Sequence, residues 1–484
     1  MSEASKTKNT GWYVHSLITI LLMFGFGYIV PPFGSITDVG MKVLGVFLGM
    51  LWGWIFVEIL WPSVLGIFAF GMTGYTTISE AISAGFGDST VLTVFMAILF
   101  AELLNQCHIT DYIANKCLSS KWIVGKPWAL VVMFFVADFL LSIFTSNVAA
   151  CFLLWAAFVK VAEAAGYEKG NKFVSYMICG IIYIGVISLM VMPFRTAALV
   201  FVGFLTSGTG LTVGYGPYTI YMLILCIVQI IVYLLIGKFI LRFDLSALEK
   251  TADIFADKRG SKMNFEQKFG MAFVVVFMAI LFLPAFLPQS LGITKFLNNW
   301  GLIGASALLL TVAAIVKKPD GKQLANIRDV CKQGIAWDII WLLVATYPLA
   351  SAMQSQDCGI MATVLGAIQP HLGATNPTLF MIICMVVLGI ATQFVHNVVL
   401  AAMFIPMMCT LCIDMGGNPI VMFFLLYMAL QCAYATPGAS MQGAMMFGNQ
   451  WLGKHDGFFY GILFLIMTYI IMIIVGIPLG NIIF

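Results

Sequence analysis

Charged residues are scarce in this sequence. Asp, Glu, Lys and Arg make up 9% of its 484 residues, whereas hydrophobic residues make up 61%. Soluble domains carry about 25% charged residues, so this composition excludes a chain with a large soluble surface. The patterns HExxH, GxSxG and DDxxD, which carry the catalytic groups of common enzymes, are also absent from the sequence. Their absence disfavours an enzyme.

Long apolar runs are abundant instead. A spanning helix needs roughly 20 apolar residues, and about eleven runs of that kind are present. They lie near 13–31, 41–55, 57–74, 89–106, 174–203, 216–241, 269–287, 298–316, 336–354, 419–450 and 456–482. Two further runs, near 127–160 and 376–413, contain a polar break halfway, which predicts helical hairpins. The sequence therefore predicts an all-α membrane protein.

The basic residues predict the topology. Of the 24 Lys and Arg residues, all but Lys42, Lys295 and Arg195 fall in loops on the same side when the N-terminus is cytoplasmic. Cytoplasmic loops carry an excess of Lys and Arg. This arrangement requires both hairpins to be re-entrant, because a full crossing would move the later basic loops to the other face. We expect a multi-pass protein of the cell membrane with a cytoplasmic N-terminus.

The chain also carries an internal repeat. A hairpin containing FTSNVAACF (144–152) precedes a run broken at VMPFRTA (191–197), and a hairpin containing ATQFVHNVVLAAMFIP (391–406) precedes a run broken at YATPGAS (434–440). The predicted topology makes the two halves inverted. Broken helices at matching positions of inverted repeats point to the binding site of a transporter. We therefore expect the two tips and the two breaks to converge.

The residue types at these positions indicate that the substrate is an anion. Asn147 and Asn397 occupy matching tips, and an amide can donate to a carboxylate while its oxygen faces a cation; the alternative is that each amide caps its own turn. Arg195 is an intramembrane cation, which is costly without a function or a partner. A guanidinium matches a carboxylate bidentately, and the alternative is a structural ion pair with Asp138.

With these motifs the chain resembles the divalent-anion/sodium symporter family, which includes dicarboxylate and citrate carriers. The resemblance rests on VEILWPS (57–63), GFGDSTV (85–91), WDIIWLL (337–343) and the two tips, and it follows the whole chain in order. It implies a homodimeric elevator transporter of succinate, malate, fumarate or citrate. In that arrangement 1–126 and 242–354 form a scaffold that includes a cytoplasmic linker, and 127–241 and 355–484 form the transport domain.

The tips depart from the family pattern of Ser-Asn-Thr. They read Ser146-Asn147-Val148 and His396-Asn397-Val398, so hydroxyls that would face sodium are missing. The predicted substrate-binding residues are Ser146, Asn147, Arg195, Thr196, His396, Asn397, Thr436 and Pro437. A residual sodium site could use Ser146, Asn147 and Asn397. His396 could titrate near neutral pH or serve only as a neutral structural residue.

The function expected from these residues is secondary active transport of small organic anions, with weak or absent sodium coupling. No cofactor is expected, and sodium or a proton is the candidate coupling ion. The expected partners are a small carboxylate, the lipid bilayer and a second copy of the chain, not nucleic acid. The alternatives are a channel, or a sodium/proton antiporter of the same superfamily, although Arg195 argues against a purely cationic substrate.

Overall fold

The computed structural model describes residues 10–123, 125–251, 262–288, 290–364, 366, 376–437 and 439–484. Within these ranges the regular elements are helices, and β-structure is limited to one isolated bridge between Lys317 and Gln323. The prediction of an all-α protein is confirmed. Part of the expected linker, 252–260, lies outside the described residues.

The helices follow the predicted runs closely. Those of the first half are α1 (Thr10–Ile29), α2 (Asp38–Phe56), α3 (Leu60–Phe70), α4 (Ile78–Phe86), α5 (Ser89–Gln106), α6 (Ile109–Leu118), α7 (Pro127–Phe144), α8 (Asn147–Ala164), α9 (Lys172–Leu189), α10 (Thr196–Thr209) and α11 (Tyr215–Leu235). Those of the second half are α12 (Phe265–Phe286), α13 (Gly292–Ile315), α14 (Ile327–Gly334), α15 (Trp337–Gln354), α17 (Pro377–Ala391), α18 (Asn397–Asp414), α19 (Pro419–Gln431), α20 (Met441–Phe447), α21 (Asp456–Ile471) and α22 (Ile477–Ile483).

Within the described residues, 11 helices are long and apolar enough to cross a membrane, or 12 when the bent pair α14–α15 counts as one span. The number of candidate spans agrees with the number predicted from the sequence, but the helices that make up this set differ. Three of the 11 are the hairpin arms α7, α8 and α18, because an 18-residue apolar arm has the length and composition of a span. Conversely, the expected span at 57–74 contains only the 11 residues of α3, which are about 16 Å long.

Both predicted hairpins are present, and each breaks at its polar centre. In the first, Ser146 caps α8 by accepting from the backbone N–H of Ala149 at 3.4 Å. In the second, Nδ1 of His396 caps α18 by accepting from Val398 N–H at 3.3 Å. A capping side chain satisfies one of the free donors at a helix start. The residue before each tip asparagine therefore has the same structural role in both halves.

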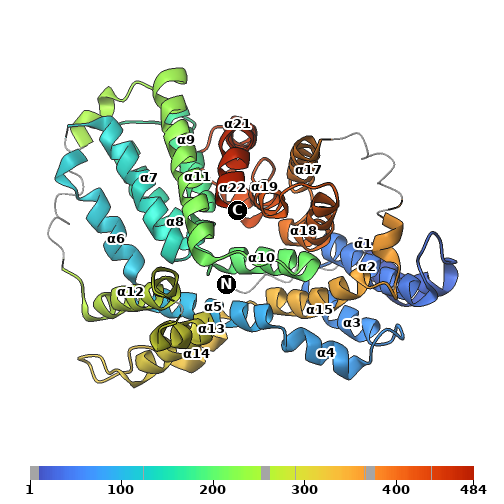
Figure 1. Ribbon diagram of the computed structural model, residues 1–484. Helices are drawn as coiled ribbons and strands as arrows, with labels where there is room; N and C mark the ends of the chain where they lie inside the picture. Colours follow the sequence, from blue (N-terminus) through green and yellow to red (C-terminus); the bar gives the residue numbers. More distant parts are fainter. Residues whose placement is uncertain are drawn as a thin grey trace.

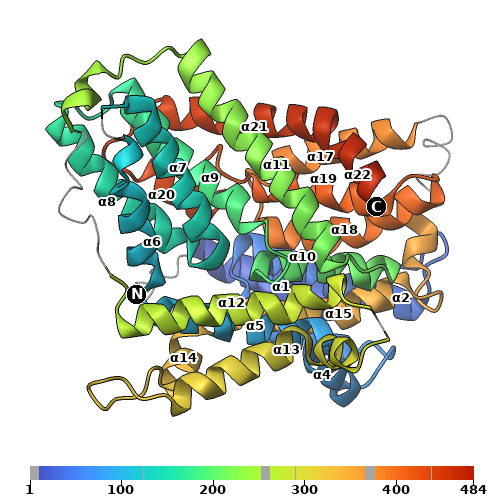
Figure 2. The same ribbon diagram turned by 60° about the vertical axis from the view of Figure 1, so that its left-hand side comes forward.

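The helices form two groups with α10 between them (Figure 1). α3, α4, α5, α12, α13, α14 and α15 lie below α10 in this view, and the two hairpins with α9, α11, α19 and α21 lie above it. In Figure 2 the α7–α8 hairpin lies toward the left of the molecule and the α17–α18 hairpin toward the right. The connection from α6 to α7, the chain that follows α11 and the connection from α13 to α14 also lie on the left.

Candidate functional site

The first hairpin tip lies against α9. Asn147 is only 5% exposed, and its Nδ2 donates to Ser142 Oγ at 3.3 Å within the same hairpin. α9 can approach this closely because it presents Gly185, where an added Cβ would lie 2.2 Å from Asn147 Nδ2. The amide is therefore fixed by its own hairpin and by a helix without a side chain at that point.

The second hairpin tip is instead bonded to the second broken helix. Asn397 Nδ2 donates to the side-chain oxygen of Gln431, the last residue of α19. Gln393 donates to the carbonyl of Cys432 at 2.8 Å and accepts from Ala435 N–H at 2.9 Å. These bonds satisfy backbone groups released where α19 stops, as buried polar groups require.

Two more hydroxyls complete that break. Thr436 Oγ1 donates to the carbonyl of Gln393 at 2.7 Å. Ser440 donates to the carbonyl of Ala433 and caps α20 by accepting from Gly443 N–H at 3.0 Å. Thr436 thus stabilises the junction between tip and break.

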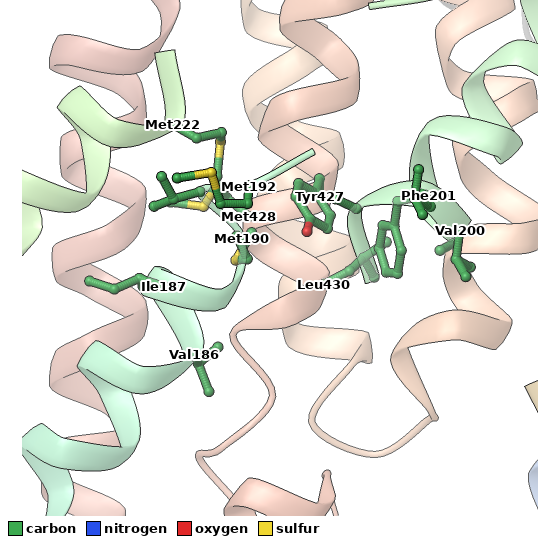
Figure 3. Close-up of a cluster of buried hydrophobic side chains, with 14 of the residues drawn as sticks. Val186, Ile187, Met190, Met192, Val200, Phe201, Met222, Tyr427, Met428 and Leu430 are labelled. Atoms are coloured by element: carbon green, nitrogen blue, oxygen red, sulfur yellow. The ribbon is translucent and has the colours of Figure 1, made fainter. Parts of the chain in front are cut away.

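The first break is lined by apolar side chains and ends at Arg195. Figure 3 shows Met190, Met192 and Val186 on one side of Tyr427, and Val200 and Phe201 on the other. The rings of Phe201 and Tyr427 have centroids 4.8 Å apart. The two broken helices therefore pack on each other through this cluster.

Arg195 precedes α10 and is half-buried. In the described part of the chain, no carboxylate lies within 4.0 Å of its guanidinium. The alternative of an ion pair with Asp138 is not observed, because that carboxyl is bonded to Ser142. Tyr427, whose hydroxyl lies near Tyr218 and Gln431, interacts electrostatically with Arg195.

The tips and breaks enclose a cavity of about 350 Å³. Five predicted residues line it, namely Ser146, Asn147, Arg195, Thr196 and Asn397. His396, Thr436 and Pro437 do not line it. The remaining walls come from α5, through Ala97, Phe100, Ala101, Leu104 and Asn105, and from residues such as Phe144, Val148, Ile339, Val398, Gln431, Ser440 and Gln442.

Sequence reasoning missed Asn105 and Gln431. Both are polar residues at the end of an apolar helix. Gln431 also directly precedes the predicted break, and this position could have identified it as a residue of the site. The other α5 residues that line the cavity carried no such signal, because they are apolar.

The cavity is electropositive for two reasons. The N-termini of α8, α10 and α18 meet there through Asn147, Thr196 and Asn397. Helix N-termini carry a partial positive charge and free N–H donors, which favour anions. Arg195 adds a full charge at the start of α10. Such a cavity is suited to a small carboxylate.

This fold and this cavity define a polytopic helical transporter. The chain belongs to the citrate transporter family, whose sequence model matches residues 47–317, and thus to the divalent-anion/sodium symporters indicated by its motifs. The predictions of the family and of a transporter rather than an enzyme are confirmed.

Several curated relatives match most of the chain. The sodium-dependent dicarboxylate transporter SdcS of Staphylococcus saprophyticus is 21% identical over 467 residues, which cover 93% of this chain and 88% of that protein. SdcS of Staphylococcus aureus is 22% identical over 466 residues, covering 91% and 88%. The sodium-dependent low-affinity dicarboxylate transporter 1 of Caenorhabditis elegans matches over 126 residues at 25% identity, 26% of this chain and 21% of that one.

Among solved structures, the YdaH transporter of Alcanivorax borkumensis has a TM-score of 0.56 at 13% identity. The alignment covers 97% of this chain and 100% of that chain. At this level of identity the likeness concerns the fold alone.

Proposed function

We propose that this protein is a secondary active carrier of small di- and tricarboxylates such as succinate, malate, fumarate and citrate. The observation that carries the proposal is the meeting of three helix N-termini, two tip amides and Arg195 on one cavity. A cavity of about 350 Å³ is at the lower end of ligand-binding sites, which suits an acid of four to six carbons. The names of the SdcS relatives point to the same substrate class.

The expected contacts follow from the geometry. Arg195 binds one carboxylate through its planar pair of donors, and Asn147 and Asn397 donate to the substrate from opposite tips. Ser146 and Thr196 supply hydroxyl groups beside these residues. A purely cationic substrate, as in a sodium/proton antiporter, would meet repulsion from Arg195 in the same cavity.

We propose an elevator movement in which 127–241 and 355–484 carry the cavity along the scaffold formed by 1–126 and 242–354. One of the contacts that would have to slide is that between α10 and α15. There, Tyr347 OH donates to the carbonyl of Val200 at 3.3 Å, and Gln354 Nε2 donates to that of Ser207 at 3.1 Å. Both bonds join one side chain to one carbonyl, and both would have to break for α10 to move along α15. The family resemblance also supports a homodimer.

The same proposal includes a cytoplasmic N-terminus and two re-entrant hairpins. It is supported by the shared position of three Lys-containing connections at one end of the molecule (Figure 2). Impermeant thiol labelling of single cysteines at Asp320 and Phe33, in a background without reactive native cysteines, tests it. Labelling of both from the same side would contradict it.

The deciding experiment is uptake of labelled succinate or citrate into proteoliposomes. A carrier shows saturation and counterflow, in which unlabelled internal anion accelerates entry of the label; a pore shows neither. Thermal shifts of the purified protein with a series of carboxylates identify the preferred acid. Uptake that is linear in concentration and insensitive to internal anion would contradict the proposal.

A further inference from the structure

A buried carboxyl group is linked by hydrogen bonds to the cavity. Asp138 lies in the middle of α7 and is completely inaccessible to solvent. Ser142 Oγ donates to its Oδ1 at 3.1 Å, and Ser142 in turn accepts from Nδ2 of Asn147 at 3.3 Å. Asn147 lines the cavity. Two hydrogen bonds therefore connect this acid to the predicted substrate site.

Among the described residues, no cation balances the negative charge of an ionised Asp138. In the described part of the chain, no Lys, Arg or His lies within 4.0 Å of it. Besides Ser142, the backbone N–H of Gly185 on α9 faces the carboxyl, but this donor is neutral and leaves the charge uncompensated. The titratable groups that interact with it are the thiols of Cys151 on α8 and Cys226 on α11. The helices α6 and α9 also pack on α7. α6 carries Tyr112, Lys116 and Cys117, and α9 carries Tyr176, Cys179 and Tyr183; among the described residues none of these side chains is hydrogen-bonded to Asp138.

An ionised carboxylate buried without a cation carries a large desolvation cost, which a proton removes. We propose that Asp138 is a proton-binding site and that this proton is taken up together with the anion. The proposal rests on the anion transport proposed above, and it assigns the coupling ion to a residue away from the cavity wall.

The coupling follows from charge and from the direction of the hydrogen bonds. While Asp138 is ionised, Oδ1 must accept from Ser142, so the hydroxyl oxygen of Ser142 holds the Asn147 amide. A proton that reaches the carboxylate from the cavity side, past Asn147 and Ser142, forms an O–H that can donate to Ser142. Ser142 can then donate to the amide oxygen of Asn147, and the amide N–H₂ is released toward a carboxylate in the cavity.

Protonation also removes the repulsion between Asp138 and the incoming anion. Because linkage is reciprocal, binding of the anion must favour binding of the proton to the same extent. Release of the anion on the other side returns the proton to water there, so one proton moves with each anion in this step.

The first test needs no substrate. Infrared difference spectra of the full-length protein, wild type minus Asp138→Asn, should contain the carbonyl stretch of a protonated carboxyl group that disappears as pH rises. If the band is absent at every pH, the proposal is wrong, whatever the protein transports. If sodium removes the band at constant pH, Asp138 is a cation site instead, which also overturns the proposal.

The second test measures coupling with fumarate, whose carboxyl groups are fully ionised near neutral pH. Its apparent affinity should fall up to about tenfold per pH unit above the titration midpoint in the wild type, and should be independent of pH in Asp138→Asn. Ser142→Ala should keep the infrared band but weaken the pH dependence, because only the repulsion between Asp138 and the anion then remains. Ser188→Ala, which removes a buried hydroxyl that bonds to the Ile184 carbonyl, is the matched control and should retain both.

The two tests separate the proposals. Binding of fumarate that depends on pH equally in the wild type and in Asp138→Asn supports anion transport but refutes this proton site. A titrating band without any carboxylate binding supports the proton site but refutes the proposed substrate.

Discussion

The two halves of the repeat hold their hairpin tips in place through different contacts. In the second half the hairpin tip is bonded to the broken helix through Gln393, Thr436 and the Asn397–Gln431 pair. In the first half the side chain of Asn147 bonds within its own hairpin and lies against a glycine. The break beside it is packed by apolar side chains and ends in an arginine without an ion-pair partner among the described residues.

This difference indicates that one half stabilises the site and the other half binds the substrate. Fully hydrogen-bonded networks make a buried polar region rigid, so the second half provides a fixed wall. Among the described residues, the first half holds a charge without an ion-pair partner and an amide whose side-chain hydrogen bonds stay within its own hairpin. We infer that the first half provides most of the binding free energy, and the second half provides the stability of the site.

Arg195→Ala should produce the largest effect on binding. Truncating one partner of a buried charge pair costs about 2–5 kcal/mol, which corresponds to a loss of roughly 30-fold or more in affinity. Arg195→Lys should recover little, because an ammonium lacks the planar pair of donors. Titration calorimetry with the preferred anion measures the loss, and thermal unfolding in its absence should be nearly unchanged. Normal binding with reduced stability would show that Arg195 is structural.

Gln393→Ala should produce the largest effect on stability. The variant leaves the Cys432 carbonyl and the Ala435 N–H without their partners in a buried place, at a cost of about 2–4 kcal/mol. The midpoint of thermal unfolding should therefore fall markedly. Gln442→Ala, which removes an amide of the cavity wall, is the control and should leave the midpoint unchanged. Equal midpoints for the two variants would remove the distinction between the halves.

The sequence predicted the two halves but not this distinction. Polar breaks within apolar runs locate the hairpins and the discontinuous helices, because free backbone groups at membrane depth need a protein or water partner. The direction of each tip side chain depends on packing between distant helices. His396 caps its helix as Ser146 does, yet only Ser146 lines the cavity. Thr436 lies beside the second break as Thr196 lies beside the first, yet Thr436 bonds to the Gln393 carbonyl and does not line the cavity.

Other features could not be predicted from the sequence, because they also depend on packing between distant helices. The wall contributed by α5 depends on how the scaffold docks, which no local pattern encodes. The expected span at 57–74 is interrupted after α3, where the chain turns before the capping box of Thr77 and Glu80 begins α4. A capping box is a local sequence signal, so the start of α4 could have been predicted.

Gly185→Ala should affect function more than stability. Its Cβ would lie 2.2 Å from Asn147 Nδ2, and the end of that side chain can move away. Displacing the amide removes a hydrogen bond to a charged substrate, worth about 1.5–3 kcal/mol, so affinity should fall roughly 10-fold or more. Gly216→Ala is the control, because nothing lies within 4 Å of its added Cβ. Unchanged affinity in Gly185→Ala would exclude Asn147 from binding.

Tyr347→Phe should change the rate of transport without changing affinity. The variant keeps the ring packed on Phe204 but removes the bond to the Val200 carbonyl across the α10–α15 contact. One such bond is worth about 0.5–1.5 kcal/mol, so the maximal uptake rate should change up to about tenfold. Tyr221→Phe is the control, because its hydroxyl bonds to Gly476 inside the proposed transport domain. Identical rates for both variants would contradict sliding at this contact.

Replacing sodium with choline should have the smallest effect, although the SdcS relatives are named as sodium-dependent. A sodium site needs several oxygen ligands, and valine takes the place of a hydroxyl at both tips, where Val148 and Val398 line the cavity. Arg195 adds a fixed positive charge that opposes a nearby cation by about 4 kcal/mol at 4 Å in an effective dielectric of 20. It can also balance a carboxylate, as a bound sodium would.

Initial rates of dicarboxylate uptake into proteoliposomes, measured in sodium and in choline at fixed pH, decide this point. Rates in the two media should be nearly equal, and internal anion or an inward proton gradient should accelerate both. Uptake that collapses in choline would show that the remaining oxygens of Ser146, Asn147 and Asn397 form a working site. Val148→Thr and Val398→Thr then compare the tips, because each returns one hydroxyl to one half. A sodium response in only one variant would identify the tip that retains the rest of the ligand set.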